Sequence, residues 1–100
     1  MNILILGGGG REHALAWAVL QNPKCARLIV APGNAGIDRI AECAVLDIED
    51  GEAVVGFAVE ESIDFVIIGP EAPLAAGVAD ALREAGILVF GPDQAAARLE

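Results

Sequence analysis

The sequence has 100 residues, of which 55% are hydrophobic, and a formal net charge of −9. A chain of this length and composition forms one domain with a buried core, which excludes intrinsic disorder. The acidic excess argues against nucleic acid and anionic membranes as partners, since both are negatively charged, and no apolar run reaches the roughly 20 residues that cross a bilayer.

The cysteine content is low, with Cys25 and Cys43 as the two cysteines. Neither belongs to a Cys-x-x-Cys or Cys/His pattern, so we expect reduced thiols and no metal site. The first apolar run covers only residues 3–6, and no Lys or Arg precedes it, which is not typical of a secretory signal. These features favour the cytoplasm.

Short apolar runs alternate with helix-like segments along the chain. Runs rich in Ile, Val and Leu are typical of strands that are buried on both faces, as in a parallel sheet. The predicted strands are residues 2–6, 27–31, 43–46, 64–69 and 87–90. The predicted helices are residues 11–21, 52–61 and 74–85, and a short turn at 37–40 joins the second and third strands. Pro73 and Gly86 mark the two ends of the last helix.

This alternation predicts an α/β fold, a Rossmann-like open parallel sheet with flanking helices, in one domain over residues 1–100. Sheets of this kind bind ligands at their carboxyl edge, where the strand order reverses, between the first and fourth strands. The sequence ends in "DQAAARLE", which resembles the first turns of another helix. We therefore expect that the chain is a piece of a longer enzyme.

Each unusual segment follows a predicted strand. "GGGGREH" follows the first strand, "APGNAG" the second, "GPEAPL" the fourth and "GPD" the fifth. All four are therefore expected at the carboxyl edge, with the glycine loop facing "GPEAPL" across the reversal point.

The glycine loop indicates an anion site. Glycines ahead of a helix let backbone N–H groups approach a phosphate, and the helix dipole favours the negative charge. The alternative is a tight turn without a ligand. A dinucleotide fingerprint fails, because its third small residue would be Glu12 or His13, and Val30, Ala31 and Pro32 at the end of the second strand include no acid. A P-loop fails too, since no Lys-Ser/Thr pair follows.

The next three side chains are candidates for the same site. Arg11 opposes the helix dipole, so it suggests either an anionic ligand or an ion pair with Glu12 or Glu71. Glu12 suits a first helical turn for structural reasons alone, and His13 either makes a local hydrogen bond or acts on a ligand. Trp17 is predicted to lie in the core.

The later loops supply further candidates. Pro32, Gly33 and Asn34 lie in "APGNAG", where Asn34 either makes a turn or contacts a sugar hydroxyl or phosphate. Glu71 lies between two prolines and either favours a helix start or accepts from an amine or ribose hydroxyl.

The motifs "GGGGREHALAW", "APGNAG", "GPEAPLAAGVAD" and "FGP" together resemble the amino-terminal, pre-ATP-grasp domain of the phosphoribosylamine–glycine ligase family in the ATP-grasp superfamily. The resemblance covers essentially the whole chain in the same order and spacing. One departure is Gly8, where family members often carry Asn or Ser.

The resemblance implies an ATP-dependent ligase of purine biosynthesis that joins glycine to 5-phosphoribosylamine, giving glycinamide ribonucleotide, ADP and phosphate. ATP and Mg²⁺ or Mn²⁺ would bind downstream ATP-grasp domains, so these residues would supply no catalytic or metal-binding group and would be inactive alone. The amides of Gly8, Gly9 and Gly10 would hold the phosphate beside Arg11, and Asn34 and Glu71 would contact the sugar or amine. The alternatives are a free-standing Rossmann-type nucleotide-binding or regulatory module and a purely structural domain.

Overall fold

The computed structural model describes residues 1–69 and 75–91. The predictions for Pro70–Leu74, which include Glu71, and for residues 92–100 lie outside the described residues. The strands are β1 (Asn2–Gly7), β2 (Arg27–Pro32), β3 (Glu42–Cys43), β4 (Phe65–Ile68) and β5 (Leu88–Phe90). The helices are α1 (Gly10–Leu20), α2 (Ala35–Asp38), α3 (Gly51–Glu60) and α4 (Ala75–Glu84). Every pairing is parallel, in the order β3-β2-β1-β4-β5. The Rossmann-like α/β fold is thus confirmed.

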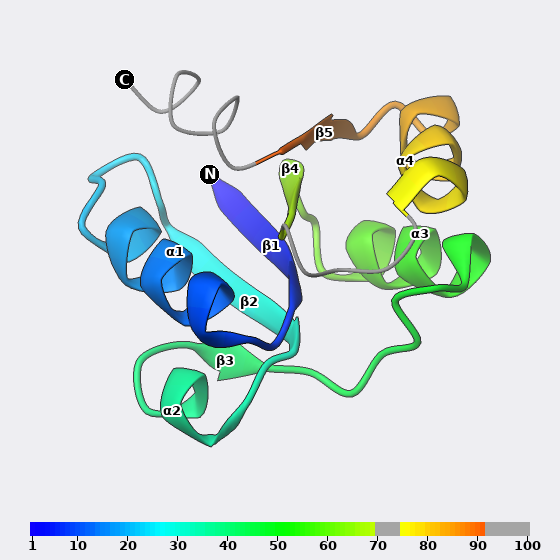
Figure 1. The fold of residues 1–100 in the computed structure, drawn as a ribbon. Coiled ribbons are helices and arrows are strands. Elements are labelled where there is room, and N and C mark those ends of the chain that lie inside the picture. The colour runs from blue at the N-terminus through cyan, green and yellow to red at the C-terminus, as the bar shows by residue number, and fades with distance from the viewer. Residues whose placement is uncertain (70–74, 92–100) are drawn as a thin grey trace.

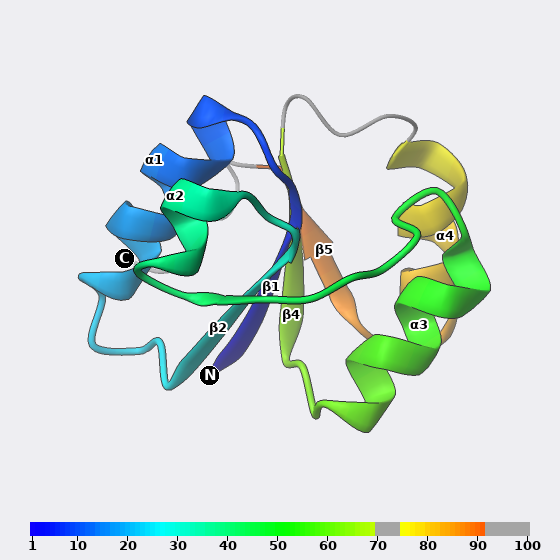
Figure 2. The same ribbon diagram turned by 90° about the horizontal axis from the view of Figure 1, so that it is seen from below.

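The molecule has three layers, with α1 and α2 on one face of the sheet and α3 and α4 on the other (Figure 1; Figure 2). The chain leaves β1 towards β2 on the α1 side, and it leaves β4 towards β5 on the α4 side. The strand order therefore reverses between β1 and β4, which is where such sheets bind ligands.

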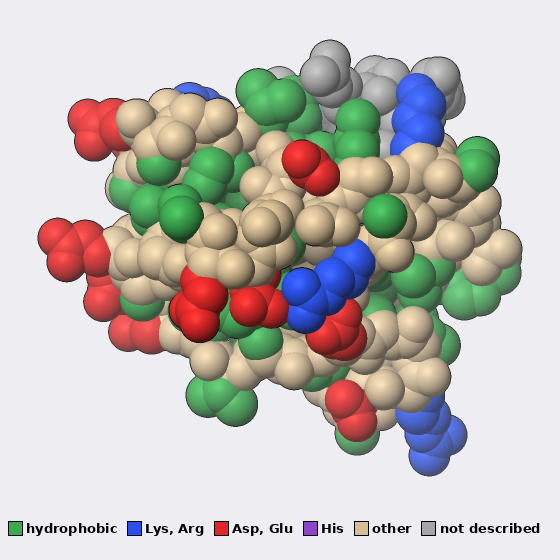
Figure 3. Space-filling model, turned by 180° about the vertical axis from the view of Figure 1, so that it is seen from behind, with side chains coloured by type: hydrophobic (Ala, Val, Ile, Leu, Met, Phe, Trp, Pro, Cys, Tyr) green, Lys and Arg blue, Asp and Glu red, His purple; other side chains and the backbone are tan. Residues whose placement is uncertain are grey.

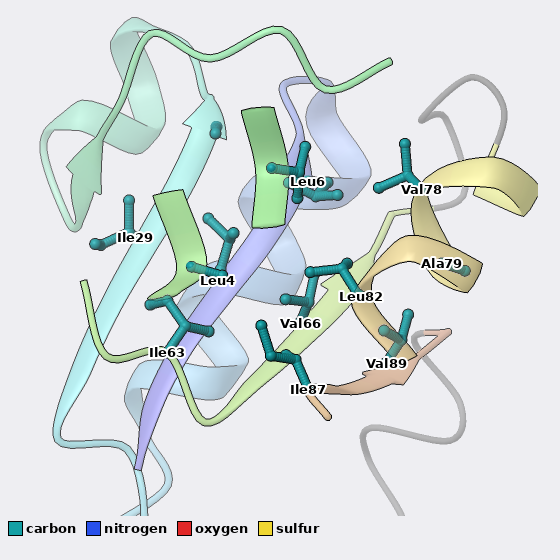
Figure 4. Close-up of a cluster of buried hydrophobic side chains, with 13 residues drawn as sticks. Leu4, Leu6, Ile29, Ile63, Val66, Val78, Ala79, Leu82, Ile87 and Val89 are labelled. Atoms are coloured by element: carbon teal, nitrogen blue, oxygen red, sulfur yellow. The ribbon is translucent and has the colours of Figure 1, made fainter. Parts of the chain in front are cut away.

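Two hydrophobic cores hold the layers together, because neighbouring strand residues point to opposite faces. Figure 4 shows the first, in which Leu4, Leu6 and Val66 of the sheet meet Val78 and Leu82 of α4. On the other face lies a second cluster, which α1 and α2 cover: Ile3, Ile5, Ala16, Val19, Leu28, Val30, Ile37, Phe65 and Ile67. Each face removes a full row of apolar side chains from water, which is the main favourable term in folding.

The ends of the helices follow ordinary capping chemistry. Asp50 accepts from the amides of Glu52 and Ala53 and so caps α3. Gly86, with φ +81°, follows α4, and the Ile87 amide donates to the Leu82 carbonyl. The predicted end of the last helix is confirmed, while its proline start lies outside the described residues.

Two predictions about the third strand need correction. Strand β3 covers only Glu42–Cys43, rather than 43–46, because its partner β2 ends at Pro32, which has no N–H to continue the ladder. Val45 is fully exposed. The connection ahead of β3 is the short helix α2 rather than a turn at 37–40.

The surface carries the acidic excess of the sequence, and Figure 3 shows acidic side chains spread over one face with few basic ones between them.

Arg27 at the start of β2 donates to Glu42 at 2.7 Å and to Glu61 at 2.9 Å, which ties β2 to β3 and to the end of α3. Among residues 1–69 and 75–91, no helix combines the length and the apolar character that crossing a bilayer requires.

Candidate functional site

The loops that follow β1 and β2 are bound to each other at the carboxyl edge of the sheet. The Gly33 amide donates to the Gly7 carbonyl at 3.1 Å, and Asn34 Nδ2 donates to the Gly8 carbonyl at 2.6 Å. A Cβ on Gly8 would lie 2.6 Å from the Gly33 carbonyl oxygen, so the two backbones are in close contact. Two segments far apart in the sequence therefore form one unit.

Asn34 holds this unit with both ends of its amide. While Nδ2 reaches Gly8, Oδ1 accepts from the Ile37 amide at 2.9 Å and caps α2. Gly33 has a positive φ of +71°, and a Cβ there would collide with the Cys43 side chain. Gly33 and Asn34 thus have structural roles in the loop, and a ligand contact by Asn34 could use its second N–H or the second lone pair of Oδ1.

The amino end of α1 presents backbone donors at the same edge. Gly9 is the residue before the helix, and the first helical hydrogen bond runs from the His13 amide to the Gly9 carbonyl at 3.1 Å. The amides of Gly10, Arg11 and Glu12 precede that bond and have no partner within the helix. Free amides and the positive end of the helix dipole are the ordinary components of a phosphate site.

Two residues of this turn are open to solvent. A Cβ built on Gly10 would meet nothing within 4 Å, so no neighbour in the described chain accounts for glycine there. Arg11 is exposed and makes no ion pair with Glu12, which removes one of the alternatives for its role. The pair offers an anion a backbone amide and a guanidinium side by side.

Glu12 is the unexpected residue of the site, because its side chain is completely buried. It lies on the same helical stripe as Ala16 and Val19, four and seven residues further on, and so points to the sheet. A Cβ on Gly69 would stand 2.6 Å from its Cγ, and a Cβ on Gly7 would collide with the same side chain. The carboxylate therefore occupies the point where β1 and β4 separate.

The hydrogen bonding of this carboxylate is incomplete. Oε1 accepts from the Gly9 amide at a long 3.5 Å, which is the returning half of a capping box whose other half cannot form because glycine has no side chain. Oε2 is enclosed and has no hydrogen-bond partner among the described residues. Buried carboxylate oxygens normally have donors, so this one needs an explanation.

His13 and Trp17 border an open hollow of about 400 Å³ on α1, together with Gly10 and Ala14. The His13 ring is half-buried against α2, where a Cβ on Gly36 would lie 3.1 Å from its Cε1. Trp17 is 59% exposed, so the prediction that it lies in the core is wrong. Trp17 follows Ala16 by one residue and therefore lies about 100° further around α1, off the buried stripe.

The predicted site residues thus come together in part. The segment from Gly8 to His13 adjoins Gly33 and Asn34, while Pro32 is exposed at the end of β2. The described ranges contain no group of three or more His, Cys, Asp or Glu side chains that could hold a metal ion. At this edge the exposed groups of the first turn of α1 are the Gly10 backbone and the Arg11 side chain.

The family comparison matches the whole chain. Residues 1–100 match the model described as "Phosphoribosylglycinamide synthetase, N domain". The chain belongs to this family. The match confirms the resemblance that the glycine loop, "APGNAG" and "GPEAPL" indicate together.

Curated relatives agree with this assignment. The chain is 59% identical over 100 residues to phosphoribosylamine–glycine ligase of Agrobacterium fabrum, 53% identical over 102 residues to that of Vibrio parahaemolyticus and 56% identical over 100 residues to that of Mycobacterium tuberculosis. All of the chain is covered in each case, but it spans only 24% of each of these relatives. The relatives are ligases about four times as long.

A solved structure supports the fold independently. CobK precorrin-6A reductase matches with a TM-score of 0.69 over 91% of this chain and 38% of that chain. The sequences are 17% identical, so the likeness concerns the Rossmann-like fold alone.

Proposed function

We propose that the chain is the amino-terminal substrate-binding domain of an ATP-dependent ligase that joins glycine to 5-phosphoribosylamine in purine biosynthesis. In that reaction ATP phosphorylates the glycine carboxylate, the amine nitrogen attacks the resulting acyl carbon, and phosphate leaves, so that glycinamide ribonucleotide, ADP and phosphate are formed. The family match and the ligase relatives support the assignment.

The domain's own part in this proposal is to hold the sugar phosphate. The observation that carries it is the start of α1, where the amides of Gly10 and Arg11 have no partner within the helix and the Arg11 guanidinium is exposed beside them. An exposed arginine is unfavourable at this end of a helix unless an anion offsets it. The Gly9 amide is directed to Glu12, so the phosphate uses Gly10 and Arg11 first, with Gly8 and Gly9 at its margin.

The remaining components of the reaction belong, in this proposal, to downstream domains of the same polypeptide in the cytoplasm. Since the ATP-grasp machinery is placed in those downstream domains, no catalytic step is assigned to these residues and the chain alone is expected to be inactive. Pro32, His13 and Asn34 border the sugar phosphate, and Glu71 is a further candidate for the sugar or the amine.

A fluorescence titration tests the proposal. Trp17 is the single tryptophan, the chain has no tyrosine, and Trp17 borders the same hollow as Gly10. Ribose 5-phosphate, a stable analogue of the labile amine, is added while Trp17 emission is recorded. Arg11→Gln is expected to weaken binding by about tenfold or more, because a charge-assisted hydrogen bond contributes about 1.5–3 kcal/mol.

The matched control is Arg39→Gln, which removes an exposed arginine from the end of α2. It is expected to leave the affinity within about twofold of the unmodified chain, since only non-specific charge changes. Equal losses in the two variants would show that overall charge, rather than a site at Arg11, attracts the ligand.

A further inference from the structure

We propose that Glu12 is the acceptor for the anomeric amino group of the sugar phosphate, so that the carboxyl edge binds the two ends of one ligand. The inference rests on the proposed function and adds to it a residue that recognises the reacting end of the substrate. Phosphate lies at Gly10 and Arg11, and the sugar's donor end lies at Glu12.

The first step in the argument is the location of the carboxylate. Glu12 is wedged between Gly7 at the end of β1 and Gly69 just after β4, the two strands between which the sheet order reverses. Both positions lack a Cβ in the space that its side chain fills. The chain thus maintains room for a carboxylate at the place where open α/β sheets bind ligands.

The second step is the missing donor. Oε1 has one long hydrogen bond, from the Gly9 amide at 3.5 Å, and enclosed Oε2 has none among the described residues. A carboxylate can accept about four hydrogen bonds, and leaving it unpaired in a buried site is costly. Because a single long bond holds it, the carboxylate has little hydrogen bonding to lose when it turns an oxygen towards a ligand donor.

The third step is the charge of the ligand. A carboxylate repels a phosphate, so the group that meets Glu12 is an N–H or O–H donor rather than the anion. The anion is placed on the other side of the first turn, at Gly10 and the exposed Arg11. A ligand with phosphate at one end and an amine at the other satisfies both, which is the chemistry of an amino-sugar phosphate.

The test compares three ligands with the unmodified chain and with Glu12→Gln. Gln keeps an oxygen for the Gly9 amide but replaces the other oxygen with an NH₂ group, which repels a ligand donor. The ligands are ribose 5-phosphate, whose anomeric hydroxyl stands in for the amine, 1,4-anhydroribitol 5-phosphate, which lacks that hydroxyl, and inorganic phosphate. Dissociation constants are measured through Trp17 fluorescence.

The proposal predicts that Glu12→Gln weakens ribose 5-phosphate about tenfold. Binding of the anhydro compound and of inorganic phosphate should change less than about twofold, or tighten, since a nearby negative charge is removed. The control Glu52→Gln alters another first-turn glutamate, in α3, and should affect none of the three ligands. Thermal melts verify that both variants are folded.

Two results would overturn the inference while the proposed function stands. One is an equal loss for all three ligands, which would assign Glu12 a purely structural role in the loop. The other is unchanged binding of ribose 5-phosphate. If instead the unmodified chain bound no ribose 5-phosphate at millimolar concentration, the proposed function itself would be wrong for this chain, and the role of Glu12 with it.

Discussion

Glu12 and Gly69 share one space at the point where β1 and β4 separate: a Cβ on Gly69 would stand 2.6 Å from the Cγ of Glu12. The relationship joins a helix to a strand end that is 57 positions away in the sequence, since 69 minus 12 is 57. It explains the glycine after β4, which is not among the glycines with a positive φ. It also means that neither residue can be altered without consequences for the other.

A double-mutant cycle tests this coupling. Gly69→Ala should destabilise the unmodified chain by more than it destabilises Glu12→Ala, because the shortened side chain removes the contacts of the new methyl group with Glu12 and leaves only that with the Leu6 carbonyl oxygen. We expect a coupling free energy of about 1 kcal/mol or more from urea unfolding. Gly56→Ala in α3, where a Cβ meets nothing within 4 Å, serves as the control and should act additively with Glu12→Ala. Additive behaviour of Gly69→Ala would contradict the packing described.

Gly10→Ala separates folding from binding. The new Cβ has no neighbour within 4 Å and alanine is the better helix former, so stability should be unchanged or rise by up to about 1 kcal/mol. Helical Cβ atoms point towards the amino end, where the phosphate would lie, so affinity for ribose 5-phosphate should fall about fivefold or more.

The same Gly56→Ala control should raise stability without affecting affinity, since α3 lies on the opposite face of the sheet (Figure 2). Urea unfolding and Trp17 fluorescence supply the two readouts. Unaltered affinity in Gly10→Ala would mean that glycine at this position serves no ligand.

Asn34→Asp tests whether the tether to the glycine loop matters for binding. Aspartate still accepts from the Ile37 amide, so the cap of α2 remains, but its second oxygen faces the Gly8 carbonyl and repels it. The glycine loop should shift, and affinity for ribose 5-phosphate should fall about fivefold or more. Isothermal calorimetry measures the loss.

Asp50→Ala is the comparison, since it removes the cap of α3 far from the glycine loop. It should cost about 1 kcal/mol of stability and leave the affinity as it was. If Asn34→Asp and Asp50→Ala weakened ribose 5-phosphate binding equally, the tether from Asn34 to Gly8 would have no specific role in binding.

The Arg27 cluster predicts a dependence of stability on pH. The hydrogen bond from Arg27 lowers the pKa of the Glu42 carboxyl from the ordinary 4.5. A lowered pKa in the folded state adds stability above pH 4.5, and this is lost as the pH falls through the folded-state value. The melting temperature of Glu42→Gln should therefore lie below that of the unmodified chain at pH 7.

That difference should shrink as the pH falls below the ordinary pKa of Glu42, and it should disappear once the pH is below the lowered pKa of the folded state. Its size should be small, because the Arg27 and Glu42 side chains are 38% and 55% exposed. Glu49→Gln, at an exposed site, controls for the change in net charge. A gap in melting temperature that stayed constant from pH 7 to pH 3 would show that the ion pair is not its cause.

The sheet could be predicted from the sequence because its signals are local. Continuous apolar runs and the glycine at the end of α4 fix the strands, the parallel arrangement and the last helix boundary. The length of β3 could not be predicted in the same way, since it depends on where Pro32 lies in the neighbouring strand. Helix α2 has only four residues, too few for a periodic pattern.

For the candidate site, the sequence predicted the glycine loop but not the side-chain contacts around it. Glycines before a helix predict where an anion would bind, but the tether from Asn34 to Gly8 and the space that Gly69 leaves for Glu12 are long-range contacts. One signal for Glu12 was present: it lies four and seven residues before Ala16 and Val19, on the buried stripe of α1. The same period places Trp17 off that stripe, and the prediction of a core position did not apply it.

The most direct test of the account is an amide NMR titration of the chain with ribose 5-phosphate. The account predicts chemical-shift changes concentrated at residues 7–13 and at Gly33 and Asn34, with the loops at the opposite edge of the sheet, such as the one around Ser62, unchanged. No shifts at millimolar ligand, or shifts confined to that opposite edge, would contradict a sugar-phosphate site at the start of α1.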